Sequence, residues 1–149
     1  MFAYALFDTV IGRCGLAWGP RGIIGVQLPE QTHQATRTRL MRHCPNADEL
    51  EPQGAIARAV ESVQALLRGE NASLRAIRLD MTRASLFNAR VYDTARAIPP
   101  GQTRTYGQIA HAIGEPDSAR AVGQALSRNP FAIVVPCHRV VGADFKLVG

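Results

Sequence analysis

Short apolar runs separated by turn residues occupy the first thirty positions of the chain. The runs lie at 2–7, 14–18 and 23–28, and glycine or proline stands between them. Apolar runs of this length, bounded by Gly and Pro, are typical of strands joined by tight turns. The pattern predicts a small antiparallel meander.

A helical pattern follows after a polar stretch at 31–53, which we expect to be helical in part. Apolar side chains recur at helical spacing at Ile56, Val60, Val63 and Leu67. Because this spacing returns to one face of a helix, it predicts an amphipathic helix laid on the sheet, with Gly69 as its C-cap. Residues 74–79 are predicted to add one more strand.

Two helices are predicted next, in the second half of the chain. The first starts after Ser85, a good N-cap, and stops at the Pro-Pro-Gly sequence at 99–101. The second is short: Thr103 or Thr105 caps its start, and Gly114 ends it.

A further helix is expected over 119–128, with Asp117 or Ser118 as N-cap and Asn129-Pro130 as its stop. Together with the short helix before it, this helix makes a helix-turn-helix pattern. Its polar side chains fall on one face, at Arg120, Gly123, Gln124 and Ser127. Such a face suits close approach to a nucleic-acid backbone, although an ordinary solvated helix shows the same pattern.

Composition and charge divide the chain at about the same place. The 149 residues are 46% hydrophobic and 19% charged, which is typical of a globular protein of one domain or two small ones. Residues 1–82 carry nine basic and eight acidic side chains, and residues 83–149 carry eight and four. We therefore expect an α+β fold: a small N-terminal antiparallel sheet with a helix at 1–82, and a mostly helical domain at 83–149.

The kind of basic residue points to a class of partner. Sixteen of the seventeen basic side chains are Arg, whose planar fork suits phosphates and base edges, so nucleic acid is a candidate partner. No apolar run approaches the roughly 20 residues that span a bilayer, and the first residues lack the features of a signal peptide. We expect no membrane partner and a cytoplasmic location.

The three cysteines are too few and too widely spread for a disulfide framework, and an odd number leaves a thiol free. Cys14 and the His43-Cys44 pair lack the CxxC or HxxxH spacing of zinc sites, so no metal is expected there.

Cys137 has the most reactive setting of the three. It follows the apolar run 131–135, which predicts a buried strand or extended segment, and it precedes His138 and Arg139. Cationic neighbours lower a thiol pKa and favour the nucleophilic thiolate. In an extended chain, His138 would reach Cys137 more easily through a bridging water than directly. By itself, the pair also fits a buried thiol next to a surface histidine.

Several motifs occur along the second half in a definite order. They are Ile98-Pro99-Pro100-Gly101, TYGQIA at 105–110, RAVG at 120–123, Asn129-Pro130 and PCHRVVG at 136–142. In this order and spacing, the chain resembles the O6-alkylguanine-DNA alkyltransferase family, also called methylated-DNA–protein-cysteine methyltransferases. The segments at 7–9 and 28–30 are also similar to the N-terminal domain of that family.

The resemblance implies direct, stoichiometric repair of double-stranded DNA. Cys137 would take the alkyl group from O6-alkylguanine, or from O4-alkylthymine, without a cofactor or metal. His138 would act as general base through water. Arg120, on a helix lying in the minor groove, would take the place of the damaged nucleotide, which is flipped into a pocket.

The resemblance also assigns supporting roles. Tyr106 would crowd the phosphate of the flipped nucleotide and assist at guanine N3 with its hydroxyl, and Asn129 would brace the recognition helix and the active-site segment. Further DNA contacts would come from Gly123, Gln124, Ser127 and Arg128. No obligate protein partner is expected.

The chain departs from the family pattern at its C-terminal end. Family members continue with a Gly-Gly loop and a helix bearing the Glu that orients the catalytic His, and we expect both to be absent here; Asp144 fits a turn role better than an orienting one. Besides an active alkyltransferase, a non-enzymatic lesion-binding protein of the same fold is consistent with the sequence. A cysteine hydrolase is disfavoured, because no oxyanion-hole pattern accompanies Cys137.

Overall fold

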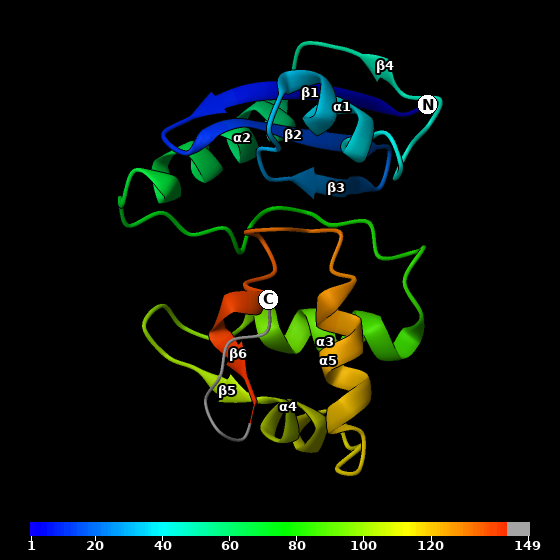
Figure 1. Cartoon of the computed structure of the whole chain (residues 1–149), viewed down its shortest axis with the longest axis vertical. Helices are drawn as coiled ribbons and strands as arrows, with labels where there is room; N and C mark the ends of the chain where they lie inside the picture. Colours follow the sequence, from blue (N-terminus) through cyan, green and yellow to red (C-terminus); the bar gives the residue numbers. More distant parts are fainter. Residues whose placement is uncertain (143–149) are drawn as a thin grey trace. The chain divides into compact units, whose positions relative to one another are not determined.

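The computed structural model of the protein describes residues 1–142 (Figure 1). It has the predicted α+β fold and divides into two compact units. Unit 1 comprises Met1–Asp80 and Pro130–Val134, and unit 2 comprises Met81–Asn129 and the chain from Val135 onward. None of the helices described is long and apolar enough to cross a membrane.

A four-stranded sheet in the order β3-β2-β1-β4 forms the frame of unit 1. β1 (Ala3–Thr9), β2 (Gly12–Gly19) and β3 (Gly22–Gln27) confirm the predicted antiparallel meander. β4 (Asp48–Glu49) pairs parallel with β1, so the sheet is mixed. The sequence does not indicate β4, because two acidic residues carry no hydrophobic alternation.

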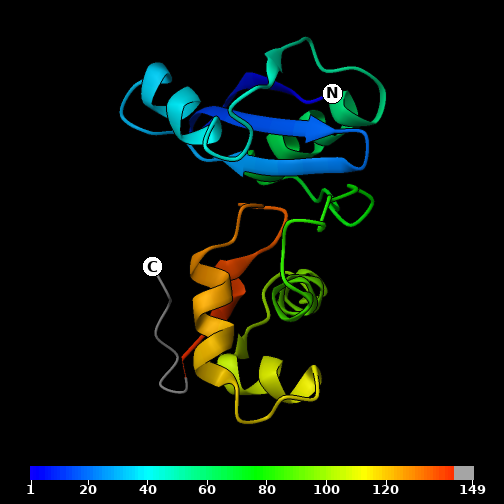
Figure 2. The ribbon, with the colours of Figure 1, turned by 90° about the vertical axis from the view of Figure 1, so that its right-hand side faces the viewer.

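Two helices cover opposite faces of this sheet (Figures 1 and 2). α1 (His33–Leu40) lies in the polar stretch that is predicted to be partly helical, and the Thr32 hydroxyl caps it by accepting from Ala35 N at 3.0 Å. α2 (Gly54–Leu67) confirms the amphipathic pattern. Gly69 follows it with a φ of 86°, the left-handed conformation that favours glycine after a helix.

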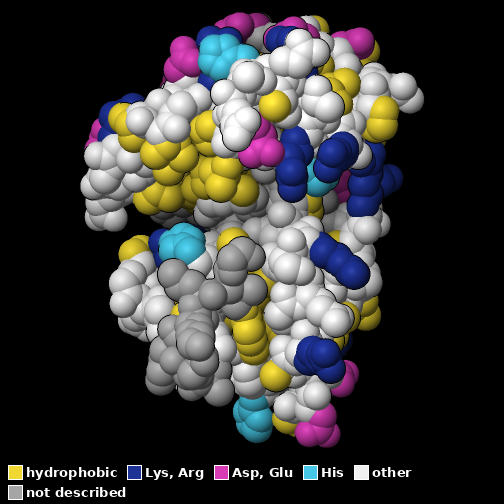
Figure 3. All heavy atoms as spheres, viewed as in Figure 1, with side chains coloured by type: hydrophobic (Ala, Val, Ile, Leu, Met, Phe, Trp, Pro, Cys, Tyr) yellow, Lys and Arg dark blue, Asp and Glu magenta, His cyan; other side chains and the backbone are white. Residues whose placement is uncertain are grey.

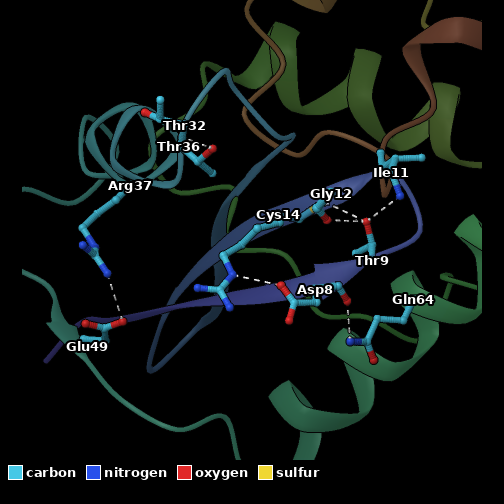
Figure 4. A network of polar contacts seen from close by, with 11 residues as sticks. Asp8, Thr9, Ile11, Gly12, Cys14, Thr32, Thr36, Arg37, Glu49 and Gln64 are labelled. Atoms are coloured by element: carbon cyan, nitrogen blue, oxygen red, sulfur yellow. Dashed lines mark hydrogen bonds and ion pairs between the residues drawn. The ribbon is translucent and has the colours of Figure 1, made fainter.

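Polar contacts fasten both helices to the sheet (Figure 4). Gln64 Nε2 of α2 donates to the Asp8 carbonyl of β1 at 2.9 Å, and Arg37 of α1 forms an ion pair with Glu49 of β4 at 3.5 Å. Arg13 donates to the Asp8 carboxylate at 2.9 Å across the β1–β2 pair. This hydrogen bond, followed by the positive charge of Arg13, lowers the pKa of Asp8.

The predicted strand over 74–79 is wrong. Only Leu79 makes a bridge, an isolated parallel one with Ile23, whose N–H donates to the Arg78 carbonyl at 2.9 Å. Leu74 and Ile77 are buried, so the apolar residues here pack an irregular segment into the core of unit 1. A short apolar run indicates burial without deciding the backbone conformation.

Unit 2 contains the three predicted helices, α3 (Leu86–Arg96), α4 (Tyr106–Ala112) and α5 (Ala119–Ser127). The Ser85 hydroxyl caps α3 by accepting from Asn88 N at 3.0 Å, as expected. α4 and α5 contact one another and form the predicted helix-turn-helix. Figure 2 shows α3 end-on beside α5.

A parallel pair of short strands lies in the same unit. β5 (Arg104–Thr105) leads directly into α4, and β6 (Val140–Val141) directly follows the 3-10 helix η1 (Cys137–Arg139). Because β5 and β6 pair, the start of α4 and the end of η1 lie next to the same two strands.

The segment 131–135 is not the strand or extended segment that its apolar run predicts. Phe131 alone bridges to Val26, and Val134 N then donates to the Ala132 carbonyl at 2.8 Å, which closes a tight turn at Ile133. Ile133 has a φ of 73°, a left-handed conformation that strains a β-branched residue. The run is buried at Phe131, Val134 and Val135, as predicted, but it turns sharply before the cysteine.

Candidate DNA-binding and thiol site

Cys137 opens η1 in unit 2 and is partly exposed, whereas Cys14 and Cys44 are buried. Its N–H donates to the Val135 carbonyl at 2.9 Å, and its own carbonyl accepts from Val140 N at the end of η1. Burial raises the pKa of Cys14, which disfavours the nucleophilic thiolate there. Of the three thiols, Cys137 is therefore the one that a reactant can reach.

His138 and Arg139 lie in the 3-10 helix η1, so the geometry of an extended chain, for which a bridging water is expected, does not apply to them. His138 is exposed, but partial burial, followed by the positive charge of Arg139, lowers its pKa. Arg139 Nη1 donates to the Ile98 carbonyl at 2.8 Å. Arg139 thus anchors η1 to the residues that follow α3, a role that the sequence does not indicate.

Asn129 joins the end of α5 to the segment before the cysteine. Its Nδ2 donates to the Val135 carbonyl at 3.0 Å, and this hydrogen bond is partly buried. The contact is consistent with the bracing role that the resemblance implies, since the same Val135 carbonyl also accepts a hydrogen bond from the N–H of Cys137.

Tyr106 is the first residue of α4, and a capping box fixes its position. The Thr105 hydroxyl accepts from Gln108 N at 3.0 Å, and Gln108 Oε1 accepts from Thr105 N at 2.9 Å. Of the two N-cap candidates, Thr103 and Thr105, the structure selects Thr105 because it can form this reciprocal pair.

The Tyr106 hydroxyl is buried and has no hydrogen-bond partner among the residues that the structure describes. Burial raises its pKa, and negative charge on Cys137 raises it further. The phenol and the Cys137 thiol are therefore close enough for their charges to interact. Buried polar groups are normally paired, so the Tyr106 hydroxyl, a donor without a partner in the described part of the chain, needs an explanation.

The exposed face of α5 matches the prediction for most of its residues. Arg120, Gln124, Ser127 and Arg128 are exposed, while Val122, Ala125 and Leu126 are buried. Figure 3 shows basic side chains over this helix. The Ser127 hydroxyl donates to the Gln124 carbonyl of its own helix at 2.7 Å. The role of this face in DNA binding stays a prediction.

Gly123 lies differently from the other residues of the predicted face. A Cβ built there would lie 3.6 Å from Cε2 and Cζ of Tyr106. The tyrosine ring therefore lies against α5 at this glycine, where a methyl group would make an ordinary contact and a larger side chain would meet the ring.

Tyr92 is a positioning residue that sequence reasoning missed. Its ring is buried, and its hydroxyl donates to the Ala125 carbonyl of α5 at 2.8 Å. Burial raises its pKa, so the hydroxyl remains a donor. The available signal was weak: Tyr92 stands one position after Val91, at the edge of the apolar stripe of α3.

Within residues 1–142, no group of three or more His, Cys, Asp and Glu side chains could hold a metal ion. The sequence-predicted site residues Cys137, His138, Asn129, Tyr106 and Arg120 all belong to unit 2. Asp144 lies outside the described residues.

Comparison with known proteins identifies close relatives. The family described as "6-O-methylguanine DNA methyltransferase, DNA binding domain" matches residues 86–149. A methylated-DNA–protein-cysteine methyltransferase from Mycolicibacterium paratuberculosis is 42% identical over 149 residues, which is all of this chain and 84% of that protein. The bifunctional transcriptional activator and DNA repair enzyme Ada of Escherichia coli is 37% identical over 146 residues, 98% of this chain and 40% of that protein.

Solved structures agree with this comparison. The crystal structure of the Mycobacterium tuberculosis O6-methylguanine methyltransferase is similar with a TM-score of 0.79 and 39% identity, covering 100% of this chain and 84% of that one. The M. tuberculosis OGT in complex with DNA gives a TM-score of 0.77 at 37% identity, covering 99% of this chain and 83% of that one.

Proposed function

The chain belongs to the methylated-DNA–protein-cysteine methyltransferase family, and on this premise we propose that it repairs alkylated double-stranded DNA by taking the alkyl group onto Cys137. One observation carries the assignment of the acceptor. Cys137 is the partly exposed thiol of the three, and its negative charge adds to the burial that raises the pKa of Tyr106, whose buried hydroxyl has no partner among the described residues.

The reaction is a displacement at the alkyl carbon on guanine O6. The Cys137 thiol first loses its proton through water to His138, whose lowered pKa keeps the imidazole neutral and able to accept. A sulfur–carbon bond then forms as the carbon–O6 bond breaks, and the electron pair passes to the guanine, which takes up a proton. Thiol and alkylguanine thus become thioether and guanine, without a further reactant.

Tyr106 is suited to assist the leaving group. As guanine departs, negative charge develops on its ring, and a positioned donor stabilises that charge. The raised pKa of Tyr106 keeps the proton on its hydroxyl, and that hydroxyl has no competing partner among the described residues. Donation to guanine N3 is the role we assign to it.

In this proposal, residues 83–149 bind DNA and accept the alkyl group, and residues 1–82 support them. Arg120 enters the stack when the damaged nucleotide is flipped out, because the alkylated atom is out of reach inside a duplex. Gln124, Ser127 and Arg128 contact the backbone from the same exposed face. O4-alkylthymine is a second substrate, and the action is in the cytoplasm, where thiols stay reduced.

The test is an intact-mass measurement after incubation with a duplex that contains one O6-methylguanine. We expect a gain equal to one CH2 per protein molecule, located on Cys137 by peptide mapping. Cys137→Ser should abolish the gain, and Cys14→Ser and Cys44→Ser should keep it. Binding to the lesion without any mass gain would contradict the proposal and support a lesion-binding protein instead.

A further inference from the structure

Unit 1 contains a hollow of about 650 Å³ that the repair chemistry of unit 2 leaves without a role. Its walls are the β2–β3 turn, the first half of α2, and the irregular segment 73–78. We call it the α2 groove. Its volume falls within the roughly 300–1,000 Å³ that is typical of ligand sites.

The lining of the α2 groove is basic and contains no acidic side chain. It includes two arginines, Arg58 and Arg78, together with the polar side chains of Gln53, Ser62 and Ser73. Both arginines are exposed, and neither forms an ion pair with another described residue. The groove therefore offers two free guanidinium groups and uncharged donors, the set that suits phosphate oxygens.

The wall that carries Arg78 is held in place by main-chain contacts. Ile23 N donates to the Arg78 carbonyl at 2.9 Å, and Asp80 N donates to the Ile23 carbonyl at 2.7 Å. The backbone at Gly22 lies so close to this segment that a Cβ on residue 22 would be 2.6 Å from the main-chain carbonyl oxygen of Arg78. The φ of 122° at Gly22 also favours glycine. Arg78 thus stands on a fixed support, which reduces the ordering cost of binding.

The start of α2 adds partial positive charge on the opposite wall. Gln53 occupies the N-cap without a side-chain hydrogen bond, and the first turn of α2 contains no acidic residue. The first N–H groups of a helix favour anions. Arg58 stands on the second turn of this helix. Figure 3 shows basic side chains gathered near the end of the sheet that carries the β2–β3 turn.

We infer that the α2 groove binds backbone phosphates of DNA through Arg58 and Arg78, as a contact of unit 1 in addition to those of unit 2. The choice of DNA over a free phosphate compound rests on the proposed function, because a DNA-repair protein meets phosphodiesters whenever it works. A mononucleotide shares the phosphate chemistry, so the experiment separates the two sources.

The first measurement is the salt dependence of binding to an undamaged duplex, made with the whole 149-residue chain. Each phosphate contact adds about 0.9 to the slope of log K against log salt, so Arg58→Gln and Arg78→Gln should each lower the slope by about 1. Arg58→Lys and Arg78→Lys keep the charge and should keep the slope. Arg68→Gln is the matched control, because Arg68 follows α2 directly and is paired with Glu70.

The second measurement locates the contact by amide NMR shifts in the Cys137→Ser protein. We expect the duplex to shift the signals of Gly22 and Ala55, which line the groove, and the same duplex to shift them less in Arg58→Gln. Shifts caused by a mononucleotide or inorganic phosphate but not by the duplex would overturn the inference, as would unchanged slopes in both glutamine variants. Thermal melting verifies that each variant is folded.

These readouts are independent of alkyl transfer. Arg68→Gln should gain the methyl group at the rate of the unchanged protein, since Arg68 lies outside the α2 groove and outside unit 2. If the slopes fall but no variant or parent protein gains mass, the groove contact stands and the proposed function fails.

Discussion

The side-chain amide of Asn129 donates to the main-chain carbonyl of Val135 at 3.0 Å, across the chain reversal that separates α5 from the cysteine segment. The same carbonyl accepts the N–H of Cys137 at 2.9 Å. One acceptor thus links the end of α5, which bears the predicted DNA-contact face, to the backbone of the predicted nucleophile. The relationship gives Asn129 a positioning role that can be tested.

Replacing Asn129 with Ala should slow alkyl transfer more than it weakens DNA binding. Loss of the hydrogen bond should lower the free energy of unfolding by about 1 kcal/mol, because the Val135 carbonyl keeps its second donor. A similar loss of positioning energy in the transition state would slow transfer about fivefold. Denaturant unfolding and single-turnover transfer measure the two effects. Asn71→Ala, at an exposed loop position, is the control, and equal transfer rates in both variants would contradict the role.

The contact between Gly123 and Tyr106 predicts a size limit at position 123. Gly123→Ala should be tolerated, because its Cβ would lie at an ordinary 3.6 Å from the Tyr106 ring, and the better helix propensity of Ala adds up to about 1 kcal/mol. Gly123→Leu should displace the ring and slow alkyl transfer. Gly107→Leu is the control, since a Cβ at Gly107 meets only Thr105 Oγ1, at 3.8 Å. If Gly123→Leu left the rate of alkyl transfer unchanged, the position of the Tyr106 ring would have no role in the reaction.

The lowered pKa of His138 predicts how transfer depends on pH. As pH falls through the folded-state pKa of His138, the imidazole is protonated and can no longer act as base, so the rate should fall there. The inflection should lie below the ordinary histidine value of about 6.5. His138→Gln should remove it. Alkyl-transfer rates measured across the acidic pH range provide the check. If His138→Gln kept the inflection, the inflection would belong to another group.

The same shift predicts a small effect on stability. Because the folded protein binds this proton less readily than the unfolded chain, unfolding is favoured as pH falls below the unfolded-state value of about 6.5. At pH values above about 6.5, His138 does not make the free energy of unfolding depend on pH. In His138→Gln, the loss of stability between pH 7 and mildly acidic conditions should be smaller, as measured by thermal melting.

Tyr92→Phe should destabilise the protein through one buried hydrogen bond. The Tyr92 hydroxyl donates to the Ala125 carbonyl at 2.8 Å, and its removal should cost about 1 kcal/mol in the free energy of unfolding. Tyr4→Phe is the control, because Tyr4 is also buried but its hydroxyl has no hydrogen bond of this kind among the described residues. Equal denaturation midpoints for the two variants would show that the Tyr92 contact adds nothing.

Arg120→Ala should weaken binding to a lesion-containing duplex more than to an undamaged one. If Arg120 enters the stack, its loss should cost roughly 1–3 kcal/mol, about 5- to 150-fold in affinity. Arg68→Ala, at an exposed arginine already paired with Glu70, should change binding little. DNA-binding titrations at the same salt concentration measure both variants. Equal losses of affinity would show that Arg120 contributes only to the general positive charge of the protein.

The sequence by itself determined the features that depend on neighbours along the chain. Ser85 and Thr105 cap helices because their hydroxyls reach N–H groups three residues away, and Gly69 and Gly114 take the left-handed conformation after α2 and α4. The meander, the amphipathic face of α2 and the helix-turn-helix follow from periodicity in the same way. Ordered motifs also identified the family, and they predict the thiol at position 137 as the alkyl acceptor.

Only the tertiary structure decided the features that depend on distant partners. The pairing of β4 with β1, the single bridge at Leu79 and the sharp turn at Ile133 follow from packing that an apolar run cannot specify. The charge effect of Cys137 on Tyr106 and the hydrogen bond from Arg139 to Ile98 join residues more than thirty positions apart. Local rules act over about one helical turn, so contacts of this range are set when the units fold around their cores.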